Sequence, residues 1–267
     1  MKIGFIGGGQ MCEGIVRGLL HSYPQSEIFI SEAYEARCAY LRNTFPVVKV
    51  TTSNVDVINS SDVVVIAVKP QQLASAFHGL TVTGNPLFIS ICAGVNLIRL
   101  EECIFKSARI ARVMPNLPAM VGEGASGFCL NGNCSESDAE VVRTILGSVG
   151  AVVERVPESL MDVVTGVSGS GPAFVCLLIE ALADAGVQHG LSRDVAIKLA
   201  AQTCVGAGKL VLASGDAGHP AVIKDKVCSP GGTSIAGVAA LEQSGFRAAA
   251  MKAVTAAVER GRELGKL

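Results

Sequence analysis

The chain has 267 residues, and 22 Lys and Arg against 23 Asp and Glu give it a formal net charge of −1. With 49% hydrophobic and 17% charged residues it is too apolar for a disordered chain. The near-neutral balance excludes a protein held electrostatically on nucleic acid or on an anionic membrane. At about 100–200 residues per domain, the length predicts two domains or one large one.

The N-terminal run MKIGFIGGGQM is too short for the apolar region of a signal peptide, and no later stretch reaches the roughly 20 apolar residues of a membrane span. Nine cysteines and four histidines are scattered along the chain without a CxxC pair. This pattern indicates free thiols in a reducing compartment. We therefore expect a cytoplasmic protein that binds no metal.

The first half alternates apolar β-type runs with helical segments. The run DVVVIAV, at residues 62–68, is typical of a strand buried on both faces of a parallel sheet. Helices are predicted at residues 11–20 and 35–43. Strands are predicted at residues 2–6, 27–31, 47–51, 62–68, 87–92, 108–114 and 126–130. The alternation predicts an α/β fold with a Rossmann-type, doubly wound, mostly parallel sheet.

The second half contains no convincing strand. Helices are predicted at residues 173–185, 193–213, 235–243 and 247–264, with Ser192 as the N-cap of the second. That second helix is apolar or small on nearly every face, so it requires burial all round. We expect an all-helical dimerisation domain at residues 157–267, after a dinucleotide-binding domain at residues 1–156, and a homodimer formed through the helices.

The first glycine cluster lies between a predicted strand and a predicted helix. Gly7, Gly8 and Gly9 allow the backbone to approach a pyrophosphate, and the helix N-terminus supplies free N–H donors. The third small position of the motif is Cys12, which makes the match imperfect. The alternative is an ordinary glycine-rich turn, but the position at the start of a βαβ unit favours a nucleotide.

The choice of cofactor depends on the end of the second strand. Glu32 follows Gly9 by about 20 residues, where an acid hydrogen-bonds the ribose 2′-OH and repels a 2′-phosphate. This favours NADH over NADPH. Arg37 lies close enough in sequence to offer the opposite contact, and Glu32 as an exposed loop acid is the alternative interpretation.

Two further glycine clusters lie in the helical half, at residues 162–173 and 224–235. In the second, Ser-Pro-Gly-Gly-Thr-Ser stands directly before an apolar helix. It offers hydroxyl groups and helix-terminal N–H groups without side-chain bulk, which suits a small anion such as a carboxylate. The alternative is a capped turn between two helices.

Together these segments resemble the pyrroline-5-carboxylate reductase family over essentially the whole chain. The resemblance is carried by IGFIGGGQM, AVKP, CAGV, RVMPNLP, TGVSGSGPAF and, most specifically, KDKVCSPGGTSIAGVAALE. Two departures stand out. The family typically has Thr where this chain has Ser234, and Ala where it has Cys12.

The resemblance implies an NAD(P)H-dependent reductase of L-1-pyrroline-5-carboxylate whose helical domains interlock as a homodimer, often within a larger ring such as a decamer. Glu32 falls where some members place a Ser that receives the 2′-phosphate. The cofactor-binding positions correspond to Ile6, Gly7, Gly8, Gly9, Gln10, Met11, Glu32, Asn54, Ala67, Val68, Lys69, Pro70, Cys92, Ala93 and Gly94. The substrate-binding positions correspond to Glu158, Ser229, Gly231, Gly232, Thr233 and Ser234.

The expected chemistry is hydride transfer to the imine carbon, which forms proline. We expect the Ser229–Ser234 segment to hold the substrate carboxylate and the Ser234 hydroxyl to donate or relay a proton to the ring nitrogen. Lys69 is more consistent with shaping the cofactor loop than with acting as the acid.

Two other functions remain open from the sequence. One is a β-hydroxyacid dehydrogenase-like reductase of a small carbonyl acid, which would use a lysine acid between its domains. Lys198 and Lys209 lie in an apolar helix without a motif around them. The other is a non-catalytic nucleotide-binding scaffold, which would not require a second anion site.

Overall fold

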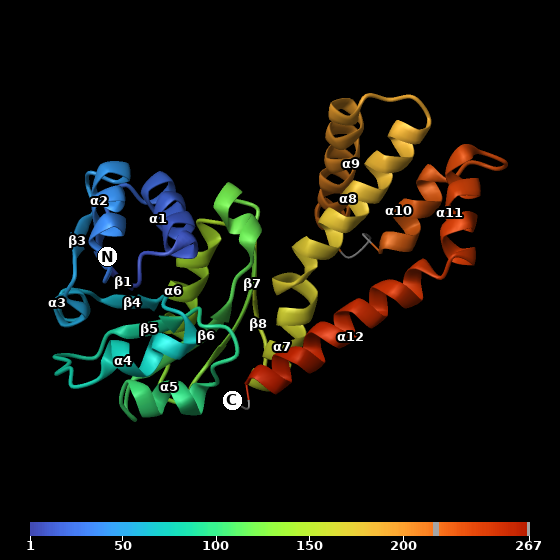
Figure 1. Cartoon of the computed structure of the whole chain (residues 1–267). Coiled ribbons are helices and arrows are strands. Elements are labelled where there is room, and N and C mark those ends of the chain that lie inside the picture. Colours follow the sequence, from blue (N-terminus) through green and yellow to red (C-terminus); the bar gives the residue numbers. More distant parts are fainter. Residues whose placement is uncertain (216–218, 266–267) are drawn as a thin grey trace. The chain divides into compact units, whose positions relative to one another are not determined.

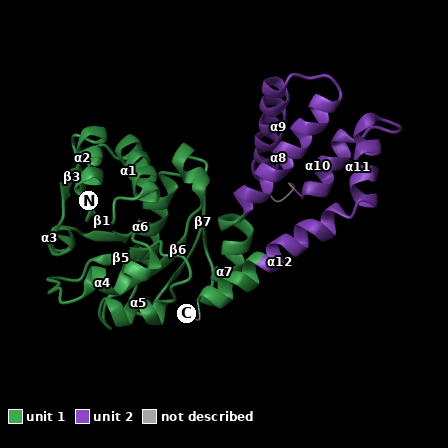
Figure 2. Cartoon of the chain, viewed as in Figure 1, with its two compact units in different colours: residues 1–170, 257–267 green, residues 171–256 purple. Residues whose placement is uncertain are grey.

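The computed structural model describes residues 1–215 and 219–265, and it divides into two compact units, shown in Figure 2. Unit 1 comprises Met1–Ser170 and Ala257–Leu267, and unit 2 comprises Gly171–Ala256. The predicted domain boundary between residues 156 and 157 falls within unit 1. Compact units need not coincide with functional domains, so that boundary stays a prediction.

Unit 1 is built on one eight-stranded sheet, with strand order β3-β2-β1-β4-β5-β6-β7-β8 (Figure 1). The first six strands are parallel, whereas β7 runs antiparallel to β6 and β8 is parallel to β7. The strands are β1 (Lys2–Ile6), β2 (Glu27–Ser31), β3 (Lys49–Thr51), β4 (Val63–Ile66), β5 (Leu87–Ser90), β6 (Arg109–Met114), β7 (Ala125–Leu130) and β8 (Val152–Arg155). The predicted Rossmann-type, mostly parallel fold is confirmed.

Helices cover both faces of this sheet, because successive strand residues point to opposite sides. In β4, Val65 packs into one core and Val64 into the other, and both are fully buried. The first core receives side chains from α1 (Gln10–Ser22), α2 (Glu35–Thr44) and α6 (Glu136–Gly147). The second receives them from α3 (Asn54–Asn59), α4 (Leu73–Phe77) and α5 (Leu97–Cys103).

The predicted elements agree with the structure best where both faces are buried. The bounds of β1 and β2 match the prediction, whereas β3, predicted from residue 47, begins at Lys49. The edge strand β8 was missed because it is short, half-buried at best, and ends in Glu154 and Arg155. The helix α6 was also missed, although Ser135 and Asp138 form a capping box at its start.

The glycine cluster at residues 162–173 is itself helical, although the sequence predicted a helix only from residue 173. Helical turns follow one another from Glu158 to Gln188. They are the 3-10 turn η3 (Glu158–Leu160), the short helix α7 (Met161–Val164), the π-helical turn η4 (Thr165–Gly169) and the helix α8 (Gly171–Gln188). The Ser170 N–H donates to the Thr165 carbonyl at 2.8 Å, the spacing of a π-helix. A Cβ at Gly169 would lie 2.6 Å from the Met114 Cε, so a larger residue there would displace the end of the Met114 side chain.

The regular elements among the described residues of unit 2 are helices: α8, α9 (Arg193–Ala213), α10 (Pro220–Val227), α11 (Thr233–Gln243) and the first part of α12 (Phe246–Leu264), which continues into unit 1. The bounds of α9 match the prediction, but α10 was missed. Ser192 is the N-cap residue of α9, yet its side chain makes no capping hydrogen bond. The helices α8 and α9 pack closely through Ala183, Ala196 and Ala200.

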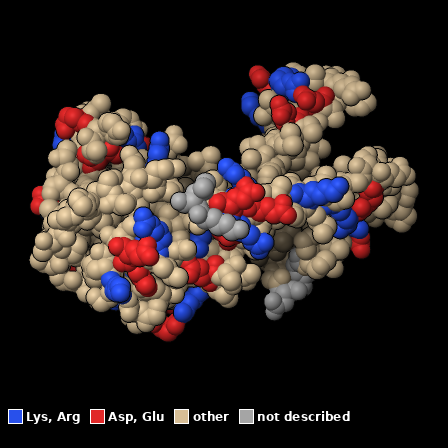
Figure 3. Space-filling view, turned by 60° about the horizontal axis from the view of Figure 1, so that its bottom comes forward, with Lys and Arg blue, Asp and Glu red and all other residues tan. Residues whose placement is uncertain are grey.

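Most of the apolar surface of unit 2 is exposed within this chain. In α8, Leu177 is 67% exposed, and in α9, Leu212 is 66% exposed. Two helical stretches, Glu158–Gln188 and Arg193–Ala213, are long and apolar enough to cross a membrane by length and composition alone, with mean hydropathies of 1.5 and 1.4. Helices that pack into a subunit interface have the same character. Figure 3 shows charged residues in small clusters of both signs, separated by broad uncharged areas.

Candidate dinucleotide site and substrate turn

The glycine turn joins β1 to α1 at the carboxyl edge of the sheet. Gly7 has a φ of +98°, and a Cβ at this position would lie 2.9 Å from the Ala67 carbonyl oxygen. Gly9 is the N-cap residue of α1, and no heavy atom lies within 4 Å of a Cβ placed there. The turn therefore leaves open space at the helix N-terminus, where the pyrophosphate of a dinucleotide fits.

Glu32, directly after β2, contacts this turn. One carboxylate oxygen accepts from the Gly8 N–H at 2.9 Å, and the other accepts from the Tyr34 N–H at 3.0 Å. The Glu32 side chain is therefore hydrogen-bonded to the glycine turn, and Glu32 is not an unattached loop acid. A carboxylate in this position is the group that reads a ribose 2′-OH in Rossmann-type proteins.

Arg37, in α2, contacts the same glycine. Its Nε donates to the Gly8 carbonyl at 2.6 Å, and its Nη2 donates to Glu13 at 2.9 Å. Glu13 also accepts from Arg17 and from the Tyr40 hydroxyl, each at 3.1 Å. Burial raises the pKa of the Glu13 carboxyl, but these three hydrogen bonds outweigh burial and hold the pKa below its ordinary value.

The neighbouring strands bring the other predicted cofactor residues to the same edge. The Ala67 N–H donates to the Ile6 carbonyl at 2.8 Å, and the Cys92 thiol donates to the Val68 carbonyl at 3.2 Å. These contacts join the ends of β1, β4 and β5, at the point where the strand order reverses. Ligands of open α/β sheets bind at such a switch point. Burial raises the pKa of the Cys92 thiol, which favours the neutral form.

Asn54 and Lys69 are placed differently. The Asn54 amide, in the first turn of α3, donates to the Ala76 carbonyl at 2.9 Å, so one of its two polar atoms serves the fold. Lys69 is exposed, and its backbone N–H faces the Gln72 side chain at 3.4 Å. Gly94 follows with a φ of +76°, which a residue with a Cβ adopts at a penalty.

Glu158 is engaged within unit 1. One carboxylate oxygen accepts from the Leu97 N–H at 2.7 Å and from Arg112 at 3.2 Å. Arg112 is nearly buried on β6 and lies 3.5 Å from Asp162 as well. These contacts stabilise the N-terminus of α5, so Glu158 has a structural task whether or not it also meets substrate.

The Ser-Pro-Gly-Gly segment of unit 2 forms a tight turn before α11. The Gly232 N–H donates to the Ser229 carbonyl at 3.0 Å, and Gly231 has a φ of +68°, as position three of a type II turn requires. Gly232 is the N-cap of α11, with no side-chain cap. Thr233 and Ser234 open the helix, and the Ser234 hydroxyl has no partner among the described residues. The segment thus presents a hydroxyl and helix-terminal N–H groups together.

No group of three or more His, Cys, Asp or Glu side chains is arranged to hold a metal ion in residues 1–215 and 219–265. The expectation of a metal-free protein stays a prediction.

Three polar residues of the site region were missed by the sequence analysis: Glu13, Arg112 and Asn116. The Asn116 amide donates to the Ser168 carbonyl of η4 at 3.1 Å and accepts from the Ala125 N–H at 2.9 Å. Most of their partners lie more than 20 residues away in sequence, such as Arg37 for Glu13, Glu158 for Arg112 and Ser168 for Asn116, so local spacing did not reveal them. Only the RVMPNLP motif, which contains Arg112 and Asn116, marked their neighbourhood.

The parallel sheet, the glycine turn with open space at Gly9, and an acid at the end of β2 define a Rossmann-type dinucleotide-dependent oxidoreductase. Family comparison gives the same class. Residues 2–94 match the family described as NADP oxidoreductase coenzyme F420-dependent. Residues 158–264 match the family described as pyrroline-5-carboxylate reductase dimerisation.

Comparison with individual proteins identifies the family over the full length. The pyrroline-5-carboxylate reductase of Synechocystis sp. is 48% identical, over 100% of this chain and 99% of its own. The solved reductase of Coxiella burnetii superposes with a TM-score of 0.91 at 33% identity, over 98% of this chain and 97% of its own. The Plasmodium falciparum enzyme, solved with NADP bound, has a TM-score of 0.85 at 34% identity, over 99% and 98%.

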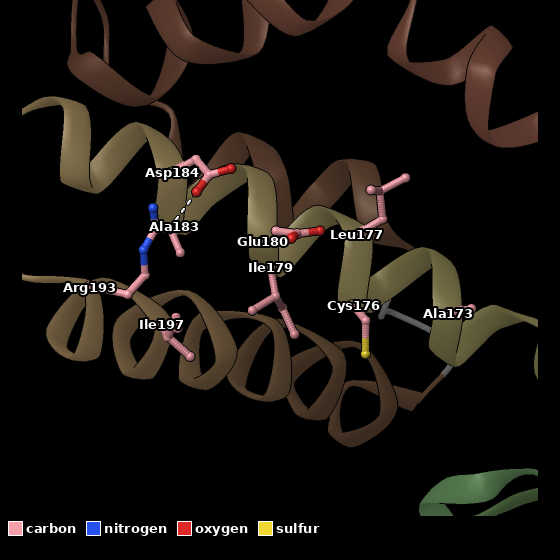
Figure 4. A pocket seen from close by; sticks show the side chains of 9 residues that line it. All are labelled: Ala173, Cys176, Leu177, Ile179, Glu180, Ala183, Asp184, Arg193 and Ile197. Atoms are coloured by element: carbon pink, nitrogen blue, oxygen red, sulfur yellow. Dashed lines mark hydrogen bonds and ion pairs between the residues drawn. The ribbon is translucent and has the colours of Figure 1, made fainter.

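The chain belongs to the pyrroline-5-carboxylate reductase family, as the resemblance predicted. It is an oxidoreductase, and its dimerisation domain makes it a homo-oligomer. The exposed apolar helices of unit 2 lie within the residues that match the dimerisation family. Figure 4 shows part of that surface, where α8 and α9 line a cavity of about 750 Å³ beside the Asp184–Arg193 ion pair.

Proposed function

We propose that this protein reduces L-1-pyrroline-5-carboxylate to L-proline with NAD(P)H. The observation that carries the proposal is the 48% identity to a pyrroline-5-carboxylate reductase over the whole chain. The glycine turn and the Ser-Pro-Gly-Gly turn support it, because one suits a dinucleotide and the other suits a small carboxylate. The reduction adds a hydride to the imine carbon and a proton to the ring nitrogen.

The residues at the carboxyl edge of the sheet hold the cofactor, which supplies the hydride when bound. Gly7, Gly8 and Gly9, with the α1 N-terminus, receive the pyrophosphate. The Ala67–Pro70 and Cys92–Gly94 segments, joined by the Cys92 thiol, form the wall next to it. A wall fixed by hydrogen bonds helps to maintain a near-attack geometry, an effect that removes about 7–11 kcal/mol from a barrier.

The Ser229–Ser234 turn binds the substrate carboxylate. The uncapped N-terminus of α11 supplies N–H donors and the positive end of the helix dipole, both of which favour an anion. The positive φ of Gly231 keeps the turn tight without a side chain over it. Glu158 is a further proposed substrate-binding residue, as the resemblance to the family implies.

Ser234 is the proposed catalytic residue. Its hydroxyl makes no hydrogen bond to a described residue, so it is available to donate or relay a proton to the ring nitrogen. The imine nitrogen is basic and becomes an electrophilic iminium once it takes this proton, so no strong acid is required. Serine in place of the family's threonine retains the hydroxyl but has a less restricted χ1.

For the cofactor, we propose a preference for NADH. Glu32 places a carboxylate against the Gly8 N–H, and its charge repels a 2′-phosphate while its oxygens accept from a ribose 2′-OH. The ratio of kcat/KM for NADH and NADPH tests this preference. A higher kcat/KM with NADPH would contradict it.

For the assembly, we propose a homodimer through the helical domain, with a larger ring such as a decamer as the complete oligomer. For the location, we propose the cytoplasm, which agrees with nine cysteines that are all free thiols. Light scattering after gel filtration measures the oligomer, and cell fractionation tests the location.

The function itself is tested by adding pyrroline-5-carboxylate and following the loss of the absorbance of the reduced nicotinamide in NADH or NADPH. A 2-keto acid is the comparison substrate with NADH and NADPH. A β-hydroxy acid is compared in the reverse direction, with NAD+ and NADP+, because a hydroxy acid can only be oxidised. We expect oxidation with the imine only. Turnover with the β-hydroxy acid instead would support the β-hydroxyacid dehydrogenase-like alternative, and cofactor binding without any turnover would support the scaffold.

A further inference from the structure

The carboxylate of Glu13 lies in an enclosed position behind the glycine turn. Glu13 is in the first turn of α1 and is only 8% exposed. It is surrounded by donors from two helices, with Arg17 on α1 and both Arg37 and Tyr40 on α2. A buried carboxylate with this many donors is fixed in place. The proposed catalytic steps assign it no task.

The guanidinium that Glu13 binds lies beside the proposed ribose site. Arg37 donates from Nε to the Gly8 carbonyl, while Glu32 accepts from the N–H of the same glycine. Both side chains therefore border one residue of the pyrophosphate turn. In Rossmann-type proteins an acid here reads the 2′-OH of NADH, and a nearby arginine accommodates the 2′-phosphate of NADPH.

Arg37 already uses one of the edges with which a guanidinium can bind a phosphate. Nε and Nη2 form this edge, which can bind an oxyanion with two parallel hydrogen bonds. Here that edge faces the Gly8 carbonyl at 2.6 Å and Glu13 at 2.9 Å. The guanidinium also lies 4.6 Å from the centroid of the Tyr40 ring, which fixes its plane.

We propose that Glu13 is a specificity-determining residue of the cofactor site, which withholds Arg37 from a 2′-phosphate by pairing with it behind the glycine turn. Glu32 then faces the ribose without a competing cation. The inference rests on the proposed dinucleotide site. It assigns discrimination between NADH and NADPH to a residue that need not touch either cofactor.

Fragment binding to the full-length protein tests this proposal without any turnover. The two probes are 2′,5′-ADP and 5′-AMP, titrated by calorimetry, and the readout is the ratio of their Kd values. Glu13→Gln replaces the carboxylate that holds Arg37 Nη2 with a neutral amide oxygen, so Arg37 is held less firmly. We expect the ratio to shift toward 2′,5′-ADP by about tenfold, the effect of one hydrogen bond to a charged group.

The matched control is Glu35→Gln. Glu35 is also on α2 and also pairs with an arginine, Arg42, but it does not contact Arg37. Both substitutions remove one negative charge near the site. An equal shift of the Kd ratio in both variants would show that the loss of any nearby negative charge causes it, and this would overturn the proposal. An unchanged Kd ratio in Glu13→Gln would also overturn it.

Arg37→Gln provides a second test that does not depend on the folding of Glu13→Gln. Since Arg37 is withheld in the native protein, its replacement should leave the ratio of the two Kd values unchanged. A selective loss of 2′,5′-ADP affinity would show that Arg37 already serves the phosphate and would overturn the proposal. If the native protein reduces no imine, the proposed function is wrong, and if it prefers NADPH, the role proposed for Glu32 is wrong. In both cases the ratio of the two Kd values still tests the role of Glu13.

Discussion

The two units of the chain differ in how they treat their apolar side chains. In unit 1, residues such as Phe88 and Ile66 are fully buried on the two faces of the sheet. In unit 2, α10 and α11 have no buried residue, and α9 buries only Ala196 and Ala200. Unit 1 therefore has its own core, whereas most helices of unit 2, which match the dimerisation family, are left exposed within this chain. Apolar residues are frequent in both units, so burial within one chain is what distinguishes the two.

The largest effect is expected from the core of unit 1. Phe88 packs edge-on against Phe77 and Phe105, with ring centroids 6.0 and 5.9 Å away. Phe88→Ala should lower the free energy of unfolding by about 3–5 kcal/mol, measured by urea denaturation. Val47→Ala, at a position 74% exposed, is the control and should change it by less than about 0.5 kcal/mol. Equal losses of unfolding free energy in the two variants would show that the buried position of Phe88 contributes no more to stability than an exposed one.

The next effect tests unit 2 as an assembly surface. Leu177→Asp places a carboxylate on the exposed side of α8, and dimerisation would have to bury it at a penalty of several kcal/mol. We expect a shift from oligomer to monomer in light scattering. Ile98→Asp, on α5 of unit 1, is a matched control because Leu177 and Ile98 are each 67% exposed. An oligomer lost only in Ile98→Asp would reverse the assignment of the two surfaces.

The third effect concerns the chemistry placed on unit 2. Ser234→Ala should lower kcat by about a hundredfold or more, because general acid catalysis contributes on that scale. The Kd for NADH, which unit 1 binds, should not change. Ser244→Ala is the control, since Ser244 lies at the opposite end of α11 and its hydroxyl donates to the Ala240 carbonyl. Unchanged turnover in Ser234→Ala would remove Ser234 from the mechanism.

The smallest effect is a pH dependence within unit 1. Burial and the opposing hydrogen bonds leave the pKa of folded Glu13 below that of an unfolded chain, which is about 4.3. A lowered pKa stabilises the fold above the unfolded value, and this stabilisation disappears as the pH falls through the folded value. Glu13→Gln should therefore be less stable than native protein at pH 7, with the gap narrowing in acid. Urea midpoints at pH 7 and pH 3 test this, and a gap that stays constant would contradict it.

The sequence predicted the elements that depend on local pattern. The continuous run in β4 and the glycine turn after β1 were recognisable because burial on both faces and a strand–turn–helix unit leave periodic signals. By contrast, β8 was missed because an exposed edge strand carries charged residues. The helix start predicted at residue 173 was wrong, because the glycine-rich residues before it form a π-helical turn, in which Gly169 packs against Met114.

The site was predicted through its glycines and its family motif, but not through its long-range pairs. Glu32 was found because its spacing from the turn is characteristic. Glu13 and Arg37 meet across two helices, so no spacing along the chain reveals that one holds the other. The same reason applies to Glu158, whose contacts with Leu97 and Arg112 arise only in the folded sheet.

The central claim is that this chain transfers a hydride to a cyclic imine. The most direct test incubates it with pyrroline-5-carboxylate and NADH that carries deuterium in the transferable position, followed by mass spectrometry of the product. We predict proline with one deuterium on the former imine carbon, which is the ring carbon bonded to nitrogen that does not carry the carboxylate. Proline without deuterium, or no proline at all, would contradict the account.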